Sequence, residues 1–175
     1  GTGYVGINTA AALAYVGHSV VGVDIDRKKV EMLRQGKAPI SEAGLDELLS
    51  QKMDLRFTSD LSECVNDADV IFIAVGTPSL PNGHANLDYV MSAARDIAGS
   101  MMPGHDVTIV VKSTVPVGVN AMIERMIRAG IAERGGNTDY LHFSSNPEFL
   151  REGCALMDTF YPDRFVFGTK DDKAY

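Results

Sequence analysis

Three glycines in the first six residues, spaced as GxGxxG, constrain the fold of this chain more than any other feature. Gly1, Gly3 and Gly6 precede a helix-like stretch, and a β-rich run then ends at Asp24. This order is typical of a βαβ unit that binds a dinucleotide. The glycines permit a tight turn, let backbone N–H groups approach a pyrophosphate and let the helix pack on the sheet. Because the motif normally follows a strand, we expect a fragment whose first strand is missing.

The acid at the end of the β-rich run favours NAD over NADP, because a carboxylate accepts hydrogen bonds from the adenosine ribose hydroxyls. Asp24 could instead cap the helix that is predicted from Arg27. Tyr4 and Val5 lie within the turn and are predicted to contact the cofactor, Val5 by packing and through its backbone N–H. A glycine-rich turn that binds no ligand is the alternative interpretation.

Composition excludes several classes of protein. With 45% hydrophobic and 22% charged residues, the 175-residue chain is typical of a globular domain. A formal net charge of −7 argues against non-specific nucleic-acid binding, which needs a basic face. Cys64 and Cys154 provide neither a disulfide framework nor metal-ligand spacing, and we expect a cytoplasmic protein. The longest apolar run, 70–75, is too short to cross a membrane, so no membrane contact is expected.

Apolar β-rich runs alternate with helical patterns along the whole chain. Strands are expected at 20–24, 55–58, 70–75, 107–111, 140–144 and 164–167. Helices are expected at 7–16, 27–35, 41–49 (capped by Ser41), 60–65, 87–98, 117–133 and 150–157. Such alternation predicts an α/β fold, a Rossmann-like, doubly wound, open and mostly parallel sheet with helices on both faces. We expect a single domain over 1–175, with the last ten residues forming a tail beyond the core.

Four polar motifs follow directly after predicted strands or, for the first, at the expected end of one. These motifs are Gly1–Gly6, Gly76-Thr77-Pro78, Lys112-Ser113-Thr114 and Asn146-Pro147-Glu148. Ligands of open α/β sheets bind at the carboxyl ends of the strands. We therefore expect all four motifs to line one crevice.

Together the motifs resemble the nucleotide-sugar 6-dehydrogenases, the UDP-glucose/GDP-mannose dehydrogenase family. The resemblance spans the whole chain, and its most specific stretch is Asn-Pro-Glu-Phe-Leu-Arg-Glu-Gly at 146–153. The other segments that carry it are Gly1–Gly6, Val23-Asp24 with Lys29, 39–45, 75–78, 112–118 and Pro162-Asp163-Arg164. Of these, 112–118 and 162–164 are more similar to the UDP-glucose branch of the family.

The resemblance implies an NAD-dependent oxidation of a sugar C6 alcohol to a carboxylate, in two hydride transfers through a cysteine thioester. UDP-glucose is the implied substrate and UDP-glucuronate the product, with GDP-mannose as the alternative. The family's cysteine, lysine, asparagine and aspartate lie C-terminal to the region covered here. The resemblance thus implies an NAD-binding half that is inactive alone and lacks the central helix and substrate domain. The full-length enzyme is expected to be a homodimer.

On the cofactor side, the resemblance implies four contacts besides the glycine-rich turn and Asp24. Lys29 lies near the cofactor, Thr77 reaches its ribose, Thr114 bonds cofactor and an ordered catalytic water, and Glu152 contacts the nicotinamide side. Three of these residues have simpler alternatives. Lys29 could be an exposed helix lysine, Thr77 a turn residue, and Thr114 a helix cap before Pro116.

On the substrate side, the resemblance assigns the segment 148–152. Glu148 assists the catalytic water during thioester hydrolysis, and backbone groups of Phe149, Leu150 and Arg151 hold the nucleotide sugar with Glu152. If the helix begins at Leu150, Glu148 and Glu152 lie near one another, four residues apart. For both acids a purely structural role is the alternative.

Other reactive residue types have simpler interpretations. Cys154 is expected to be a buried helix cysteine, and Cys64 likewise, since nothing at a defined spacing would activate either thiol. The four histidines show no metal-ligand spacing. Two rival functions stay open: a dinucleotide-binding module without activity, and a β-hydroxyacid-type dehydrogenase, which would not account for the stretch at 146–153.

Overall fold

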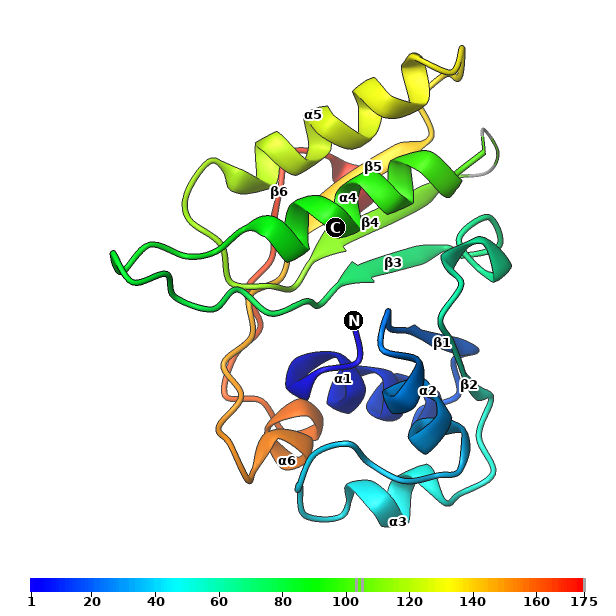
Figure 1. Cartoon of the computed structure of the whole chain (residues 1–175), viewed down its shortest axis with the longest axis vertical. Helices are drawn as coiled ribbons and strands as arrows, with labels where there is room; N and C mark the ends of the chain where they lie inside the picture. The colour runs from blue at the N-terminus through cyan, green and yellow to red at the C-terminus, as the bar shows by residue number, and fades with distance from the viewer. Residues whose placement is uncertain (103, 105, 175) are drawn as a thin grey trace. The chain divides into compact units, whose positions relative to one another are not determined.

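The computed structural model describes residues 1–102, 104 and 106–174 of the chain (Figure 1). It divides into two compact units. The first unit comprises Gly1–Asp60 and Phe149–Phe165, and the second comprises Leu61–Glu148 and Val166–Tyr175.

The first unit is a two-stranded parallel sheet surrounded by helices. Its elements are α1 (Tyr4–Tyr15), β1 (Val20–Val23), α2 (Arg27–Arg34), α3 (Leu45–Leu49), β2 (Leu55–Thr58) and α6 (Ala155–Phe160). β1 pairs with β2 in the register Val20 to Leu55. Helix α6, far along the chain, packs beside α1 (Figure 1).

A small apolar core explains why these helices pack on this sheet. Ile7 and Ala11 lie one helical turn apart on α1 and are fully buried, and they share the core with Val30 and Leu33 of α2 and Phe57 of β2. α2 is capped by Asp26, whose side chain accepts hydrogen bonds from the amides of residues 28 and 29.

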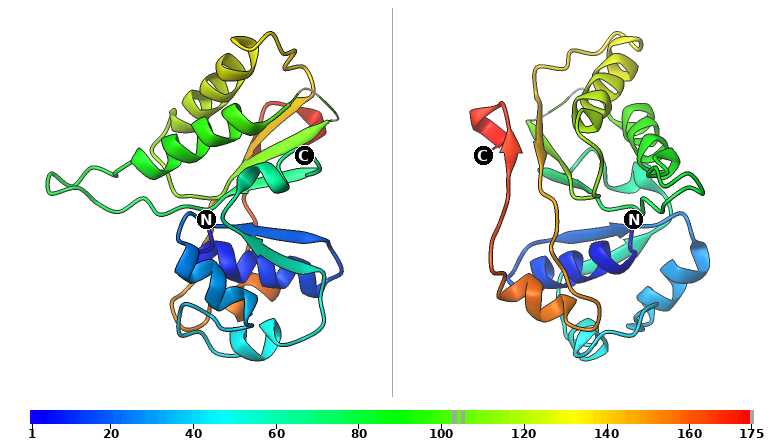
Figure 2. Two further views of the ribbon diagram at one scale, coloured as in Figure 1. Left: turned by 45° about the vertical axis from the view of Figure 1, so that its right-hand side comes forward. Right: turned by 90° about the vertical axis from the view of Figure 1, so that its left-hand side faces the viewer.

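The second unit is a four-stranded sheet with two long helices. Its elements are η1 (Leu61–Glu63), β3 (Val70–Ile73), α4 (Asp88–Ser100), β4 (Val107–Val111), α5 (Val119–Ala132), β5 (Leu141–Ser145), β6 (Gly168–Thr169) and η2 (Asp172–Ala174). The strand order is β3-β4-β5-β6, with parallel pairing except between β5 and β6. α4 and α5 lie side by side on one face of the sheet (Figure 2).

The core of the second unit follows from two sequence periods. Val107, Ile109 and Val111 alternate along β4, so their side chains share one face of the sheet. Ile123 and Ile127, with Ile131 one turn further, form the buried stripe of α5 that covers this face, together with the apolar side of α4.

The predicted α/β class with parallel strands is confirmed, but the strands pair as two sheets, one in each unit, and not as one. A Rossmann sheet has the order 3-2-1-4-5-6, in which the strand before the glycine-rich turn joins the two halves. The pair β2-β1 corresponds to the 3-2 half of that order, and the three strands β3-β4-β5 correspond to its 4-5-6 half.

Several predicted boundaries are wrong. Ser41 caps no helix, because α3 begins only at Leu45, and its N-cap is Gly44, which has a positive φ of 79°. The helix predicted at 150–157 begins only at Ala155. No strand lies at 164–167, where one was predicted; the strand of this region, β6, is Gly168–Thr169. The last residues are no tail, since β6 pairs with β5.

Candidate functional site

The glycine-rich turn leads directly into a helix N-terminus. α1 begins at Tyr4, its N-cap Gly3 provides no side-chain hydrogen bond, and the first intrahelical bond is donated by the Ile7 amide to the Gly3 carbonyl. The earlier amides of a helix have no partner within it and carry the positive end of its dipole. A Cβ added to Gly3 would meet nothing within 4 Å. The turn thus combines amide donors with open space, as a pyrophosphate requires.

Asp24, at the end of β1, is bound to this turn. Its Oδ2 accepts hydrogen bonds from the Thr2 amide (2.8 Å) and the Thr2 hydroxyl (2.9 Å), and Oδ1 accepts from the Asp26 amide (3.0 Å). Although burial raises the pKa of Asp24, the amides of Asp26 and Thr2 together with Lys29 and the Thr2 hydroxyl lower it to about 2. The carboxylate is therefore ionised and fixed at the strand end, as a ribose acceptor requires.

Lys29 completes this group with its ammonium 3.0 Å from Asp24 Oδ2. The side chain of Lys29 is only 28% exposed, so the alternative of a free helix lysine is wrong. The alternative that Asp24 caps α2 is also wrong, because Asp26 provides the cap.

The Tyr4 side chain reaches from the turn to the segment before α6. Its hydroxyl lies 2.7 Å from the Arg151 carbonyl and 3.0 Å from Glu42 Oε2, and it accepts a hydrogen bond from the Gly153 amide at 2.9 Å. The predicted cofactor turn and part of the predicted substrate segment are thus in contact. The sequence motifs assigned no role to Glu42, although it lies in the stretch 39–45 that carries part of the family resemblance.

Residues 149–153 form an irregular loop, because α6 begins only at Ala155. The proximity of Glu148 and Glu152 that a helix would have produced is therefore not supported. Arg151 is held by Asp158, which accepts from its Nη2 at 2.6 Å and from its backbone amide at 2.9 Å.

The remaining side chains of the loop are open to solvent on one side. The ring of Phe149 is half-exposed, with the Arg164 guanidinium 4.7 Å from its centroid. Leu150 is half-buried and Glu152 is exposed. The loop is therefore held at its backbone while most of its side chains remain accessible.

In the second unit, two predicted site residues meet where β3 and β4 end. The Thr77 hydroxyl donates to the Thr114 carbonyl at 2.9 Å. Beside them, the Ser113 hydroxyl lies 2.7 Å from the Val75 carbonyl and accepts from the Val75 amide at 2.9 Å. Thr114 is not the cap of α5, since the N-cap of that helix is Gly118.

Lys112 connects the end of β4 to the segment that follows β5. Its ammonium donates to Asn146 Oδ1 at 3.0 Å, and Asn146 Nδ2 donates to the Val166 carbonyl at 2.9 Å. Burial lowers the pKa of Lys112, and the charge of Glu148 opposes this shift. Lys112 had no predicted role of its own, although a lysine directly after a buried strand was the signal that could have indicated one.

Both cysteines depart from the expected burial. Cys154 is exposed and precedes α6, while Cys64 is half-buried next to η1. Cys154 is exposed because α6 begins after it, and the buried positions of that helix are Ala155 and Leu156. Among the described residues, no group of His, Cys, Asp and Glu side chains is arranged to hold a metal ion. In the same part of the chain, no helix has the length and apolarity needed to span a membrane.

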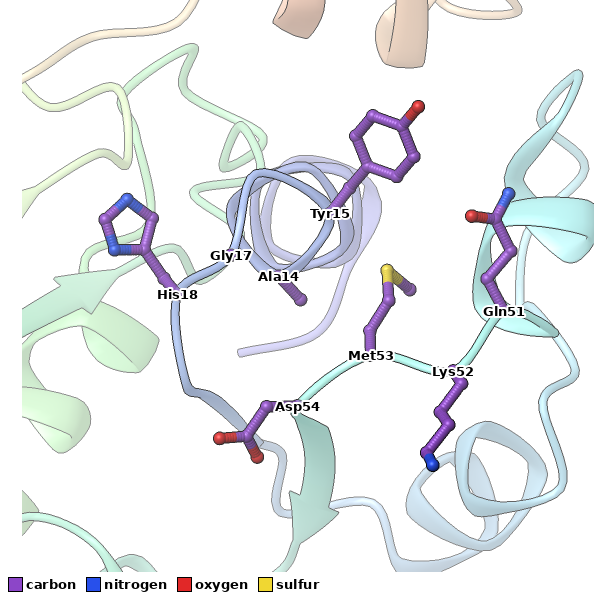
Figure 3. Close-up of a pocket in the computed structure, with 8 residues that line it drawn as sticks. All are labelled: Ala14, Tyr15, Gly17, His18, Gln51, Lys52, Met53 and Asp54. Atoms are coloured by element: carbon purple, nitrogen blue, oxygen red, sulfur yellow. The ribbon is translucent and has the colours of Figure 1, made fainter.

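A pocket of about 360 Å³ lies in the first unit, lined by residues of α1 and by the segments that precede β1 and β2 (Figure 3). His18 and Asp54 line it, and they lie just before β1 and β2 respectively. This pocket is therefore at the amino ends of the strands. Asp24 and the glycine-rich turn mark the carboxyl end, where ligands of parallel sheets bind.

The predicted site residues thus form two groups. The second unit contains Thr77, Thr114 and Glu148. The first unit contains all the others: Gly1, Gly3, Tyr4, Val5, Gly6, Asp24, Lys29, Phe149, Leu150, Arg151 and Glu152. The expectation that all of them line one crevice stays a prediction.

Comparison with known proteins supports the assignment of the chain as an NAD-binding domain. Residues 1–175 match the UDP-glucose/GDP-mannose dehydrogenase family, NAD binding domain. The UDP-glucose 6-dehydrogenase YwqF of Bacillus subtilis is 45% identical over 99% of this chain and 39% of its own length. The chain thus spans about two fifths of this relative.

Two solved structures are similar over 99% of the chain. A ternary complex of GDP-mannose dehydrogenase from Pseudomonas aeruginosa has a TM-score of 0.92 at 38% identity, with 41% of that chain covered. A UDP-glucose dehydrogenase from Pyrobaculum islandicum has a TM-score of 0.86 at 43% identity, with 40% covered. The family match covers residues 1–175 and agrees with the glycine-rich turn and the buried Asp24. This chain therefore belongs to the UDP-glucose/GDP-mannose dehydrogenase family, as its NAD-binding domain.

Proposed function

We propose that the protein oxidises the C6 alcohol of UDP-glucose to the carboxylate of UDP-glucuronate. Two hydride transfers would reduce two NAD, and water would release the acid from a thioester on a cysteine outside residues 1–175. The observation that carries this proposal is the buried, ionised Asp24 bound to the glycine-rich turn. The names of relatives at 45% and 43% identity favour the UDP-glucose branch.

NAD would supply the hydride acceptor, and the residues of this chain would hold it in place. The amides at the start of α1, including those of Tyr4 and Val5, would bind the pyrophosphate. Asp24 would accept from the adenosine ribose, with Lys29 keeping its carboxylate oriented. Thr77 would reach the cofactor ribose, and Glu152 the nicotinamide side.

The reacting end of the substrate would be served by Thr114 and the segment 148–152. Thr114 would orient a water near the reacting carbon, and Glu148 would take up a proton from that water during thioester hydrolysis. Backbone groups of Phe149, Leu150 and Arg151 would hold the nucleotide sugar. The hydrogen bonds of Tyr4 and Asp158 to this segment support a fixed backbone there.

The test is NAD reduction by the full-length gene product, followed at the nicotinamide absorbance with UDP-glucose and GDP-mannose in parallel. Two NADH per UDP-glucose are expected. Turnover of GDP-mannose alone would move the substrate to the second candidate, which the solved ternary complex favours.

A variant pair tests the role of Glu148. Glu148→Gln should lower kcat by about 10²–10⁴-fold, the usual contribution of a positioned acid or base. The exposed Glu133→Gln serves as the matched control and should leave kcat unchanged. NAD binding without turnover of either nucleotide sugar would instead favour a dinucleotide-binding module and remove the catalytic role of Glu148.

A further inference from the structure

Two polar side chains of the first unit, from different segments, hold the loop that precedes α6. We propose that Tyr4 and Glu42 are positioning residues that fix the backbone of 151–156 to the first turn of α1. Because residues 149–152 are the proposed sugar-binding segment, this inference rests on the proposed function. It assigns a role to Glu42, which the sequence motifs left without one.

The Tyr4 hydroxyl is the centre of the contact. It accepts from the Gly153 amide at 2.9 Å and lies 2.7 Å from the Arg151 carbonyl, so it is bonded on both sides of Glu152. Tyr4 is the first residue of α1, one position after the N-cap Gly3. The loop is therefore bound to the helix end whose amides face the proposed pyrophosphate site.

Glu42 adds a second connection through both of its carboxylate oxygens. Oε2 lies 3.0 Å from the Tyr4 hydroxyl, and Oε1 accepts from the Leu156 amide at 3.3 Å. Leu156 lies in the first turn of α6, whose N-cap Cys154 provides no side-chain hydrogen bond. Glu42, 114 residues earlier in the chain, thus accepts a hydrogen bond from that first turn. The helix dipole also favours a negative charge at this end of α6.

The protonation state of the tyrosine suits this role. Burial and the hydrogen bond to Glu42 raise the pKa of Tyr4 to about 12. The hydroxyl therefore keeps its proton at neutral pH, and this single proton faces two acceptors, Glu42 Oε2 and the Arg151 carbonyl. An ionised phenolate would repel both, so the contact depends on the neutral form.

Three variants separate the two connections, and two others serve as controls. Tyr4→Phe keeps the ring and removes the hydroxyl. Glu42→Ala removes both carboxylate oxygens, whereas Glu42→Gln keeps one oxygen for the Leu156 amide. Tyr15→Phe is the control on the same helix, since the Tyr15 ring packs edge-on against Phe160 and is half-exposed. Glu47→Gln, at an exposed position of α3, is the control for the charge.

Amide hydrogen exchange, measured on the full-length gene product, tests the contact directly. Tyr4→Phe should speed exchange of the Gly153 amide about two- to tenfold, and Glu42→Ala should do the same for Leu156, the effect of losing one hydrogen bond. Glu42→Gln should lie closer to the wild type at Leu156. Unchanged exchange at both amides would overturn the inference.

Kinetics on the full-length gene product read the functional consequence. Glu42→Ala should raise KM for UDP-glucose about three- to tenfold, while the Kd for NAD and kcat stay within about twofold. Tyr4→Phe should raise the same KM by a similar factor. A lower melting temperature with an unchanged KM would mean that the contact is only structural and would overturn the inference. Inactivity of the wild type would refute the proposed function, while the exchange data would still decide the contact.

Discussion

Thr2 donates both its backbone amide and its hydroxyl to one carboxylate oxygen, Asp24 Oδ2, at 2.8 and 2.9 Å. The residue inside the glycine-rich turn and the acid at the end of β1 therefore form one rigid group. Thr2 is 1% exposed and Asp24 8% exposed, so water competes little for these bonds. The same contact holds the turn of the proposed pyrophosphate site and the carboxylate of the proposed ribose site. Its loss should therefore affect both the stability of the fold and the binding of NAD.

Asp24→Asn should raise the Kd of the chain for NAD about tenfold. It should also lower the free energy of unfolding by about 1–3 kcal/mol. The amide keeps the shape of the side chain but presents an N–H₂ group to donors that now lack an acceptor. Calorimetric titration with NAD and a urea melt measure the two effects. Asp54→Asn, at an exposed position before β2, should change neither. Unaltered NAD affinity in Asp24→Asn would refute the assignment of the ribose site.

The stability contributed by Asp24 should depend on pH in the acid range. Its pKa is about 2 in the folded chain against an ordinary value of 3.8, so the unfolded state binds a proton first as the pH falls. The contribution is therefore complete above about pH 4 and is lost as the pH falls through 2. Urea melts of the wild type and Asp24→Asn across this range should converge at low pH; a constant difference would contradict this account.

Gly22 should tolerate no side chain, because β1 and β2 approach closely there. A Cβ on Gly22 would lie 2.5 Å from Cδ1 of the Phe57 ring and 3.1 Å from Cγ2 of Thr2. Gly22→Ala should therefore lower the free energy of unfolding by about 1–3 kcal/mol, as overpacking usually does. Gly99→Ala is the opposite case.

Gly99 lies within α4, and its Cβ would meet nothing within 4 Å. Alanine there should stabilise the chain by about 0.5–1 kcal/mol, since glycine is the poorer helix former. Denaturant melts compare the two variants directly. Equal effects of both substitutions would show that the close contact at Gly22 is absent in solution.

Lys112→Met should destabilise the second unit, because it removes a hydrogen bond to the buried side chain of Asn146. Asn146 is only 5% exposed, and the Lys112 ammonium donates to its Oδ1. Methionine keeps the apolar stem but leaves this buried oxygen without that donor, which costs about 1–3 kcal/mol. The exposed Lys170→Met should change the free energy of unfolding by less than about 0.5 kcal/mol. Thermal melts that fail to separate the two variants would argue against the Lys112–Asn146 contact.

Local patterns were sufficient where the chain's own neighbours decide the conformation. The apolar, β-rich run at 107–111 predicted β4 to the residue, and the run 55–58 was likewise confirmed as β2. Both strands could be predicted from their short apolar runs and their β-branched and aromatic residues, because these side chains pack well on a pleated sheet. The helix predicted at 150–157 was wrong at its start for the opposite reason: the loop at 149–153 is held by hydrogen bonds to Tyr4 and Asp158, which its local helical pattern does not record.

By itself, the sequence determined the α/β class, the glycine-rich turn, the choice of NAD and the family, because these depend on residue types at short, fixed spacings. Only the tertiary structure decided that Glu42 reaches Leu156 across 114 positions, that Lys112 holds Asn146, and that Asp26 rather than Asp24 caps α2. The physical reason is that hydrogen bonds between distant segments depend on how the chain packs, and no local period in the sequence records that geometry.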